Sequence, residues 1–553
     1  MLYLCSLGLQ AQQTPLSAMS NEQFLDYLRI TRSGVAPAHG GTQTLQPSDR
    51  CGLSIAAEIV RRNPTLGVAQ REELRSLLAP PPYQTSVISP SGLFEIHFDT
   101  SGAHMAGLLN PAGQVIPGTA FEYARDVATY FDSSYVFEVL QRGYLPPPFE
   151  SGTQRYHVYV KNKYPNYGET LLQTQLSSGT ARPCYTTFIE MDNDFREFKS
   201  KGLEGAKVTA AHEFHHMIQI GSYGFWDTDR FFYEMTAVYF EDEVYDSVND
   251  YVYYLPTFFS HPERSLYQSD GYDIAIWLKM IHARHDPDVV RNFWERVRSD
   301  APMKAMNDGL ISRQSDLSVE FCAFAQWNYY TKTRWTGKKD EYEEGAVYPL
   351  VNIITTLNLA GTTGAMSGSV TPLAADYVRA YRGPDTVVFA IANVDVPAAL
   401  NKGNSAAGYQ LEVRTEGYGP DYTRIDSLGW GYKFIPEPGA SLCVSSLLHN
   451  PAANITISSP FPNPFHSTTD QNLFFPIDRA STATRADLYV FSASMSLVRK
   501  MENIEIRPDS RFGRYVAWDG KDSQGREAAT GVYIYYLQYG NVNRTGKIAV
   551  QNR

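Results

Sequence analysis

The segment "VTAAHEFHHMIQIG", residues 208–221, places His212 and His216 four positions apart, with Glu213 directly after the first. Its apolar flanks favour a buried helix, and residues four apart on a helix share one face. Both imidazoles can therefore bind one ion, while Glu213 reaches a water molecule on that ion. With 12 His in 553 residues, this H-E-x-x-H motif is expected by chance in only about 1% of such chains. The segment therefore predicts a metal site.

A zinc ion held by two histidines needs a third protein ligand and an open position for water. Gln219 and Ser222 stand where a metzincin carries glycine and histidine, which excludes that ligand set. The next helical run, "FFYEMTAVYFEDE", carries Glu234, 18 residues after the motif, and Glu241, two turns further along the same face. Glu234 is the expected ligand. Glu241 is either the ligand instead or a partner that orients one of the histidines.

These residues resemble a known family. "HEFHH" followed by "YEMTAVYFED" is similar to the gluzincin peptidases, which combine HExxH with a downstream glutamate, and the second stretch resembles the "NEGFAxYxE" helix of the aminopeptidase N family. Val238 stands where thermolysin, of the same clan, has an acidic residue, so the contacts around the ligands must differ.

A closer resemblance is to an uncharacterised group of secreted bacterial metalloproteases. That group has "AAHEFFHxxQ", "ExxAxWxED", an "NDY" segment and a Tyr-led helix before a β-sandwich. The corresponding stretches here are "AAHEFHHMIQ", "EMTAVYFED", "NDYVYYL" and "GYDIAIWL", within a match over most of residues 50–450. The resemblance implies a secreted zinc endopeptidase acting on polypeptides.

The resemblance also implies roles for particular residues. Zn²⁺ is expected on His212, His216 and Glu234, with Glu213 as the general base that takes a proton from the attacking water. Tyr272, which heads a later helix, is the preferred donor to the developing oxyanion, although simple packing is an equal account of it.

Other residues near the motif are secondary candidates for roles at the site. Tyr267 and His261 stand behind Tyr272 as candidate oxyanion donors. Gln219 and His215 fall inside the family motif without being ligands, so we expect them to support the ligands or to be ordinary polar helix residues. The stretch "CYTTFIEMDND", residues 184–194, occupies the place of the edge strand that aligns the substrate in gluzincins. An ordinary sheet strand has the same pattern.

Length and charge limit the remaining possibilities. A chain of 553 residues is too long for one hydrophobic core, so several domains are expected. The net charge is −11 and no block of Lys and Arg occurs, which argues against a nucleic-acid partner. No apolar run approaches 18 residues, so no membrane span is predicted.

The first residues, "MLYLCSLGLQAQQ", are similar to the end of a secretory signal peptide cleaved near Ala11, although a basic leader is missing. Cleavage there would remove Cys5 and leave four cysteines: Cys51, Cys184, Cys322 and Cys443. Four cysteines permit one or two disulfides without dictating the pairing, and buried free thiols fit equally well. The expected location is secreted or attached to the cell surface.

The patterns along the chain predict a multidomain α+β protein. Residues 1–12 are the signal peptide remnant, and residues 13–345 form the metallopeptidase domain. That domain has an α/β part to about residue 204 and a helical part over 205–345. Short alternating strands with Gly, Pro and Asn turns predict a β-sandwich over 346–455, and a last all-β segment covers 456–553.

The last segment carries a resemblance of its own. "WDGKDSQGREAATGVYIYYL" is similar to the Ig-like domain of flagellar hook-capping proteins. "FPNPF", "GVYIYYL" and "GKIAV" resemble the C-terminal sorting domains of the type IX secretion system. The resemblance implies an Ig-like sorting domain that contacts the secretion machinery.

Two other functions remain open. One is a surface adhesion or binding protein whose peptidase-like domain is inactive; the intact Glu213 argues against it, because a degenerate copy usually loses the base first. The other is a zinc aminopeptidase, which lacks support because the "GxMEN" stretch of the aminopeptidase N family is absent. Internal cleavage of polypeptides is therefore favoured.

Overall fold

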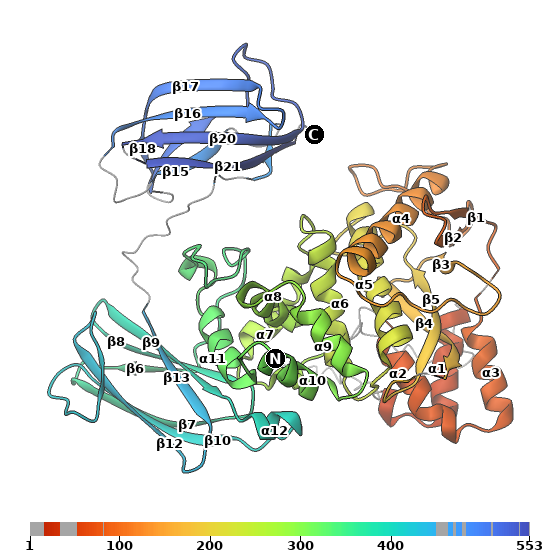
Figure 1. The fold of residues 1–553 in the computed structure, drawn as a ribbon, viewed down its shortest axis with the longest axis horizontal. Coiled ribbons are helices and arrows are strands. Elements are labelled where there is room, and N and C mark those ends of the chain that lie inside the picture. Colours follow the sequence, from red (N-terminus) through yellow and green to blue (C-terminus); the bar gives the residue numbers. More distant parts are fainter. Residues whose placement is uncertain are drawn as a thin grey trace, which may run out of the picture.

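The structure is a computed structural model that describes residues 16–33, 52–80, 82–177, 179–448, 460, 463–467, 472–477, 483–509, 513–540 and 542–551. The expected signal peptide remnant and Cys51 lie outside the described residues. The chain is a mixed α and β protein with several separate sheets (Figure 1), which confirms the multidomain α+β organisation expected from the sequence.

The first sheet has five strands in the order β1-β2-β3-β5-β4. The inner strands β2, β3 and β5 are parallel, and β1 and β4 are antiparallel strands at the two edges. The strand bounds are β1 Thr85–Ile88, β2 Phe94–Phe98, β3 Tyr156–Val160, β4 Gly168–Leu176 and β5 Cys184–Met191.

The sheet order corrects one expectation. The sequence left the stretch 184–194 open between an edge strand that aligns the substrate and an ordinary sheet strand. Its strand β5 is hydrogen-bonded to β3 on one side and to β4 on the other, so the edge-strand interpretation is wrong. A strand paired on both sides has no free backbone groups for a peptide. The edge strand beside the H-E-x-x-H helix is β4, which the sequence patterns did not reveal.

The two faces of this sheet differ in polarity. On one face, fully buried apolar residues such as Phe94 and Val158 pack against helices α4 (Ala120–Tyr135) and α5 (Leu203–Ile218). The alternate positions, which point to the other face, carry polar residues including Glu95, His157 and Glu190.

Three N-terminal helices, α1 (Asn21–Ser33), α2 (Leu53–Arg62) and α3 (Val68–Leu78), lie against the β4 side of the sheet. Arg32 of α1 reaches the polar face, where its Nη2 lies 2.7 Å from Glu190 Oε1. The amine of Lys163 also donates to Glu190, at 3.1 Å. The charge of the buried Glu190 is therefore paired, as a buried carboxylate requires.

The helical part follows the sheet. α5 is buried along almost its whole length, because the sheet covers one side while α4 and α6 cover others. Figure 1 shows α5 between the sheet and α6, with α8 beyond. The remaining helices are α6 Arg230–Val244, α7 Leu255–Ser260, α8 Ala275–Arg284, α9 Val289–Val297, α10 Pro302–Ile311 and α11 Leu317–Trp327.

A β-sandwich comes next, with the sheet orders β11-β12-β10-β7 and β13-β9-β8-β6. Its strands are β6 Thr355–Asn358, β7 Thr363–Val370, β8 Ala375–Arg382, β9 Asp385–Asn393, β10 Ala407–Arg414, β11 Thr423–Ile425, β12 Trp430–Pro436 and β13 Leu442–Leu448, with the short helix α12 (Val396–Leu400) between β9 and β10.

The second sheet of the sandwich packs against α11. Sandwich residues such as Ala390 and Leu447 belong to the same buried apolar cluster as Phe324 of α11. A disulfide between Cys322 of α11 and Cys443 of β13 joins the two parts covalently, and Cys184 is a buried free thiol. The sandwich and the helical part therefore stabilise each other.

The last segment forms two sheets with the orders β14-β21-β20-β16-β17 and β15-β19-β18 around a separate core that includes Leu488 and Trp518. Its strands are β14 Phe465–His466, β15 Leu473–Ile477, β16 Arg485–Ser492, β17 Leu497–Glu505, β18 Arg507–Asp509, β19 Gly513–Trp518, β20 Gly531–Tyr539 and β21 Val542–Gln551. Because this core is distinct, the segment is a separate module.

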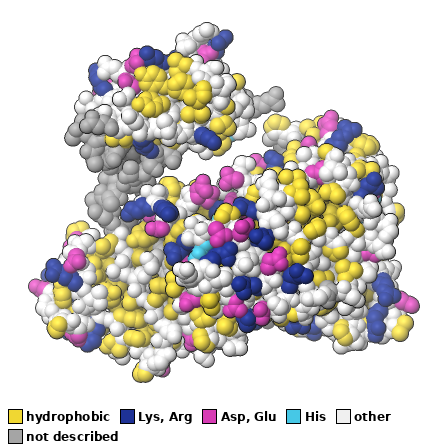
Figure 2. Space-filling model, viewed as in Figure 1, with side chains coloured by type: hydrophobic (Ala, Val, Ile, Leu, Met, Phe, Trp, Pro, Cys, Tyr) yellow, Lys and Arg dark blue, Asp and Glu magenta, His cyan; other side chains and the backbone are white. Residues whose placement is uncertain are grey.

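The surface charge and the length of the helices can be compared with the expectations of no nucleic-acid partner and no membrane span. On the face shown in Figure 2, acidic and basic side chains lie interspersed, so the net negative charge is not gathered into one patch there. Among the described helices, none is both long enough and apolar enough to cross a membrane.

The disulfide gives the first testable prediction. Replacing both half-cystines (Cys322→Ala/Cys443→Ala) opens a loop with a sequence separation of 121 residues. We expect the free energy of unfolding to fall by about 2–4 kcal/mol, because the unfolded chain regains conformational entropy. Urea denaturation followed by fluorescence measures the loss, with Cys184→Ala as a control that keeps the disulfide. An unchanged urea midpoint in the double variant would contradict the assigned pairing.

Candidate metal site

Helices α5 and α6 pack against each other and bring the expected ligands together. His212 Nε2 and His216 Nε2 lie 3.1 Å apart. Glu234 Oε2, from α6, lies 3.3 Å from the first of these nitrogens and 3.5 Å from the second. All three residues are buried, at 5% exposure or less. Three donor atoms from two helices therefore converge on one point.

These distances match those of a zinc site. At metal–ligand distances of 2.0–2.1 Å, the edge of a coordination tetrahedron is about 3.3 Å long. The three distances between donor atoms, 3.1, 3.3 and 3.5 Å, are close to that length. Glu241, the alternative ligand, does not join this group, because its Oε1 lies 2.7 Å from Nδ1 of His212 instead. It occupies the position of a partner that orients the histidine.

Hydrogen bonds on the far side of each ring show which nitrogen carries the proton. The carboxylate of Glu241 can only accept, so Nδ1 of His212 donates to it. Gln219 donates its amide Nε2 to the Tyr233 carbonyl at 2.9 Å, which turns its Oε1 toward Nδ1 of His216, 2.6 Å away. That nitrogen is therefore also a donor. In their neutral forms, both histidines therefore turn a lone pair on Nε2 toward Glu234.

Three acceptors at this spacing in a buried site repel one another unless a cation lies between them. Protonation of His212 is therefore strongly favoured at this site. Burial works against it, yet the hydrogen bonds with Glu234 and Glu241 raise the pKa of His212 to about 9. A divalent metal ion satisfies the same requirement without protonating a ring, so the residues present fit zinc.

Glu213 lies beside the two histidines but faces the sheet. The hydroxyl of Thr170, on the edge strand β4, donates to Glu213 Oε2 at 2.7 Å. Gly168 of the same strand leaves room for the carboxylate, because a Cβ there would lie 2.9 Å from Glu213 Oε1. Burial raises the pKa of Glu213 above its ordinary value. A carboxylate with a raised pKa is suited to accept a proton and return it.

Tyr272 lies at the other side of the site. Its ring is parallel to that of His212, with the ring centroids 6.0 Å apart. The preceding Gly271 has a φ of +112°, and a Cβ on it would lie 2.5 Å from Cβ of Glu234. Glycine therefore lets this turn pack directly on the ligand and places Tyr272 beside the histidine.

The two other candidate oxyanion donors lie elsewhere. The Tyr267 hydroxyl donates to the carbonyl of Gly403 at 2.5 Å, toward the β-sandwich. The His261 side chain is 58% exposed, with its Nδ1 3.0 Å from Glu263 Oε1. Of the three residues considered for this role, the structure brings only Tyr272 to the site.

His215 points away from the ligands, as its place on the helix requires. Its Nδ1 lies 2.7 Å from Oε2 of Glu138, and both side chains are fully buried. The imidazole stacks on Phe240 at a centroid distance of 4.2 Å. Burial lowers the pKa of His215 well below its ordinary value and raises that of Glu138, so both are neutral and share one hydrogen bond. This pair anchors α5 within the core.

Sequence reasoning missed four residues that shape the site: Thr170, Gly168, Gly271 and Glu138. Glu138 lies in a π-helical turn, Val136–Gln141, at the end of α4. π-helical turns are frequent at functional sites, but they have no reliable sequence pattern. Gly271 is the exception, because a glycine directly before a candidate tyrosine indicates a close backbone approach.

A pocket of about 420 Å³ lies near the site but does not include the ligands. Tyr254 lines it together with residues that include Tyr167, Lys199 and Lys201. The ring of Tyr254 also contacts that of Tyr272, at a centroid distance of 5.5 Å. The pocket is therefore separated from His212 by two aromatic rings.

The chain shows little similarity to known proteins. No protein-family model matches the chain, and no curated protein matches it. Two solved structures from Porphyromonas gingivalis are similar to parts of it. PorZ, described as an essential surface component of the type IX secretion system, shares 14% identity at a TM-score of 0.13 and covers 20% of this chain. Dimeric latent PorU shares 13% identity at a TM-score of 0.15 and covers 27%. The chain spans only 14% and 18% of those two proteins, and likeness at these scores supports no conclusion about function.

The geometry predicts different effects of removing the two carboxylates. Glu234→Gln replaces the anionic carboxylate of the converging set with a neutral amide, a much weaker zinc ligand, so we expect zinc affinity to fall by more than about 100-fold. Glu241→Gln keeps all three donors but weakens the orientation of His212, so a fall of about 10–100-fold is expected. Competition with a chelator of known zinc affinity measures both. Equal losses, or a larger loss for Glu241→Gln, would contradict the assignment of the ligand.

Proposed function

We propose that this chain is a zinc-dependent endopeptidase of the gluzincin type that hydrolyses internal peptide bonds of polypeptides. The observation that carries the proposal is the convergence of His212 Nε2, His216 Nε2 and Glu234 Oε2, with a buried Glu213 beside them. Two histidines and one carboxylate leave a fourth position open, as catalytic zinc sites do. The resemblance of the two helices to gluzincin motifs points to the same chemistry.

The residues have separate tasks in this proposal. A zinc ion bound here supplies a Lewis acid that polarises the peptide carbonyl and makes water more acidic. His212, His216 and Glu234 hold the ion, while Glu241 and Gln219 fix the two rings with Nε2 facing it. Glu213 takes the proton from the attacking water at its carboxylate and later gives it to the leaving amine.

Two further parts of the site have proposed roles. The hydroxyl of Tyr272 donates to the oxyanion that forms on the scissile carbonyl. Thr170 of β4 donates its hydroxyl to Glu213 and holds the proposed general base in place.

We also propose that the protein acts outside the cytoplasm, secreted or attached to the cell surface. The disulfide between Cys322 and Cys443 favours an oxidising compartment. The C-terminal module has its own core, and it resembles sorting domains of the type IX secretion system in sequence. In this proposal the C-terminal module contacts the secretion machinery during export.

Removing the general base tests the enzymatic claim. Glu213→Gln keeps the size of the side chain and leaves the three ligands in place, so zinc should remain near one ion at this site while cleavage falls by about 10²–10⁴-fold. The assay uses an internally quenched peptide with an acetylated N-terminus, which an aminopeptidase does not cleave. Glu204→Gln, an exposed position on the same helix, is the matched control. Equal turnover by Glu213→Gln and wild type would refute the proposed base. No cleavage by wild type would contradict an endopeptidase, and the same peptide with a free N-terminus would then separate an aminopeptidase, which cleaves it, from an inactive binding module.

The role of Tyr272 can be tested separately. Tyr272→Phe removes only the hydroxyl and keeps the ring beside His212. If that hydroxyl stabilises the oxyanion, kcat falls by about 10²–10³-fold while KM changes little. Steady-state kinetics on the same peptide give both values. A wild-type kcat would show that Tyr272 only packs against the histidine.

A further inference from the structure

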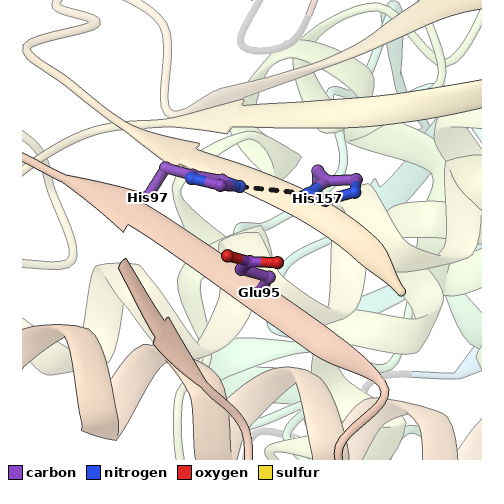
Figure 3. Close-up of side chains that lie close together, drawn as sticks. All are labelled: Glu95, His97 and His157. Atoms are coloured by element: carbon purple, nitrogen blue, oxygen red, sulfur yellow. Dashed lines mark hydrogen bonds between the residues drawn. The ribbon is translucent and has the colours of Figure 1, made fainter. Parts of the chain in front are cut away.

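A second group of potential metal ligands lies on the polar face of the five-stranded sheet, away from α5. Glu95 and His97 belong to β2, and His157 belongs to the neighbouring strand β3. The parallel register places Glu95 opposite His157, and residues two apart on a strand point to the same face. In Figure 3 the two imidazoles face each other across the strands, with the carboxylate of Glu95 on the same side.

The three side chains approach closely enough to share one ion. Nε2 of His97 lies 3.0 Å from Nδ1 of His157, and one ligand atom from each of the three residues lies within 4.8 Å of the others. All three residues are partly exposed, so an ion can enter from solvent. A simple hydrogen bond between two rings is the plainer account of the 3.0 Å contact, but it gives no role to the third side chain.

Neighbouring groups hold these side chains in place. The ring of Tyr159 stacks on that of His97, with centroids 4.5 Å apart and planes 13° apart. The hydroxyl of Ser86 donates to Glu95 Oε1 at 2.8 Å. Thr153 Oγ1 lies 3.4 Å from Nε2 of His157, on the far side of that ring. Such outer contacts orient metal ligands and lower the entropy lost on binding.

The imidazoles are in the state that a metal requires. Burial lowers the pKa of both His97 and His157, so both rings are neutral at neutral pH. A neutral imidazole offers a lone pair to a metal, whereas a protonated ring offers none. Two imidazoles and a carboxylate are a donor set for zinc and its neighbours in the first transition row, and not for Ca²⁺ or Mg²⁺, which prefer oxygen ligands.

We propose that Glu95, His97 and His157 bind a second divalent transition-metal ion, of the Zn²⁺ class, which links β2 to β3. This site is independent of the ligands on α5 and α6, because it lies on the opposite face of the sheet. Its ion ties β2 to β3, the strand beside β5, and it therefore stabilises the sheet that supports the α5 helix.

Zinc titration of the full-length chain tests the proposal. After complete chelation, calorimetry and metal analysis should show two Zn²⁺ per wild-type chain. His97→Gln and His157→Gln should each lower zinc affinity at one site by more than about 100-fold while the other equivalent still binds. His261→Gln is the matched control, since this histidine also lies 3.0 Å from a carboxylate but has no third donor among the described residues. It should keep both equivalents.

The outcomes separate this site from the proposed catalytic one. Glu234→Gln should lose one equivalent and keep the other, and adding His157→Gln to it should remove both. Peptide cleavage by His97→Gln should stay within about twofold of wild type, because this side chain lies on the face of the sheet opposite the one that packs against α5. If His97→Gln and His157→Gln bind as much zinc as wild type, with unchanged affinities, the second site is refuted and the catalytic proposal stands.

Discussion

The structure around the site depends on one electrostatic constraint. Two imidazole nitrogens and a carboxylate oxygen, all acceptors, lie 3.1–3.5 Å apart in a buried site between α5 and α6. Without positive charge between them, this arrangement costs free energy that packing alone does not return. In the proposed function a cation lies at this point between the helices, and the surrounding structure fixes which atoms face it. Glu241 and Gln219 hold the rings, and Gly271 lets the next turn pack against Glu234.

The rest of the fold holds this helix pair in place. The sheet contacts α5 on one side and supplies Thr170 as a hydrogen-bond donor to Glu213. The buried pair of His215 and Glu138 anchors the side of α5 that faces α4 and its π-helical turn. The β-sandwich joins the helical part through a shared core and a disulfide. The polar face of the same sheet carries a second cluster of ligands, so the sheet presents different chemistry on its two faces. Its inner strands make this possible, because their alternate residues point in opposite directions.

The sequence correctly predicted those features that depend only on residues close together in the chain. The spacing of His212 and His216, the long apolar helices and the alternating strand β2 follow from periodicity, and the structure confirms those elements. The choice between Glu234 and Glu241 remained open, because both lie on one face of α6 and only packing decides which turn meets α5. The sequence could not decide whether residues 184–194 form an edge strand or an ordinary strand, because strand order is a nonlocal property, and the structure shows an inner strand. β4 itself was missed because its first half is buried on both faces, with Glu169 paired to Lys163, so it lacks simple alternation.

The most direct test of the central claim is a crystal structure of the zinc-loaded protein with anomalous data collected at the zinc edge. The account predicts an anomalous peak bonded to Nε2 of His212, Nε2 of His216 and a carboxylate oxygen of Glu234, at about 2.0–2.2 Å from each. The open side of that ion should face Glu213. An absence of anomalous density there in zinc-loaded crystals, with the three side chains still converging, would contradict the claim that this helix pair is built to hold a metal.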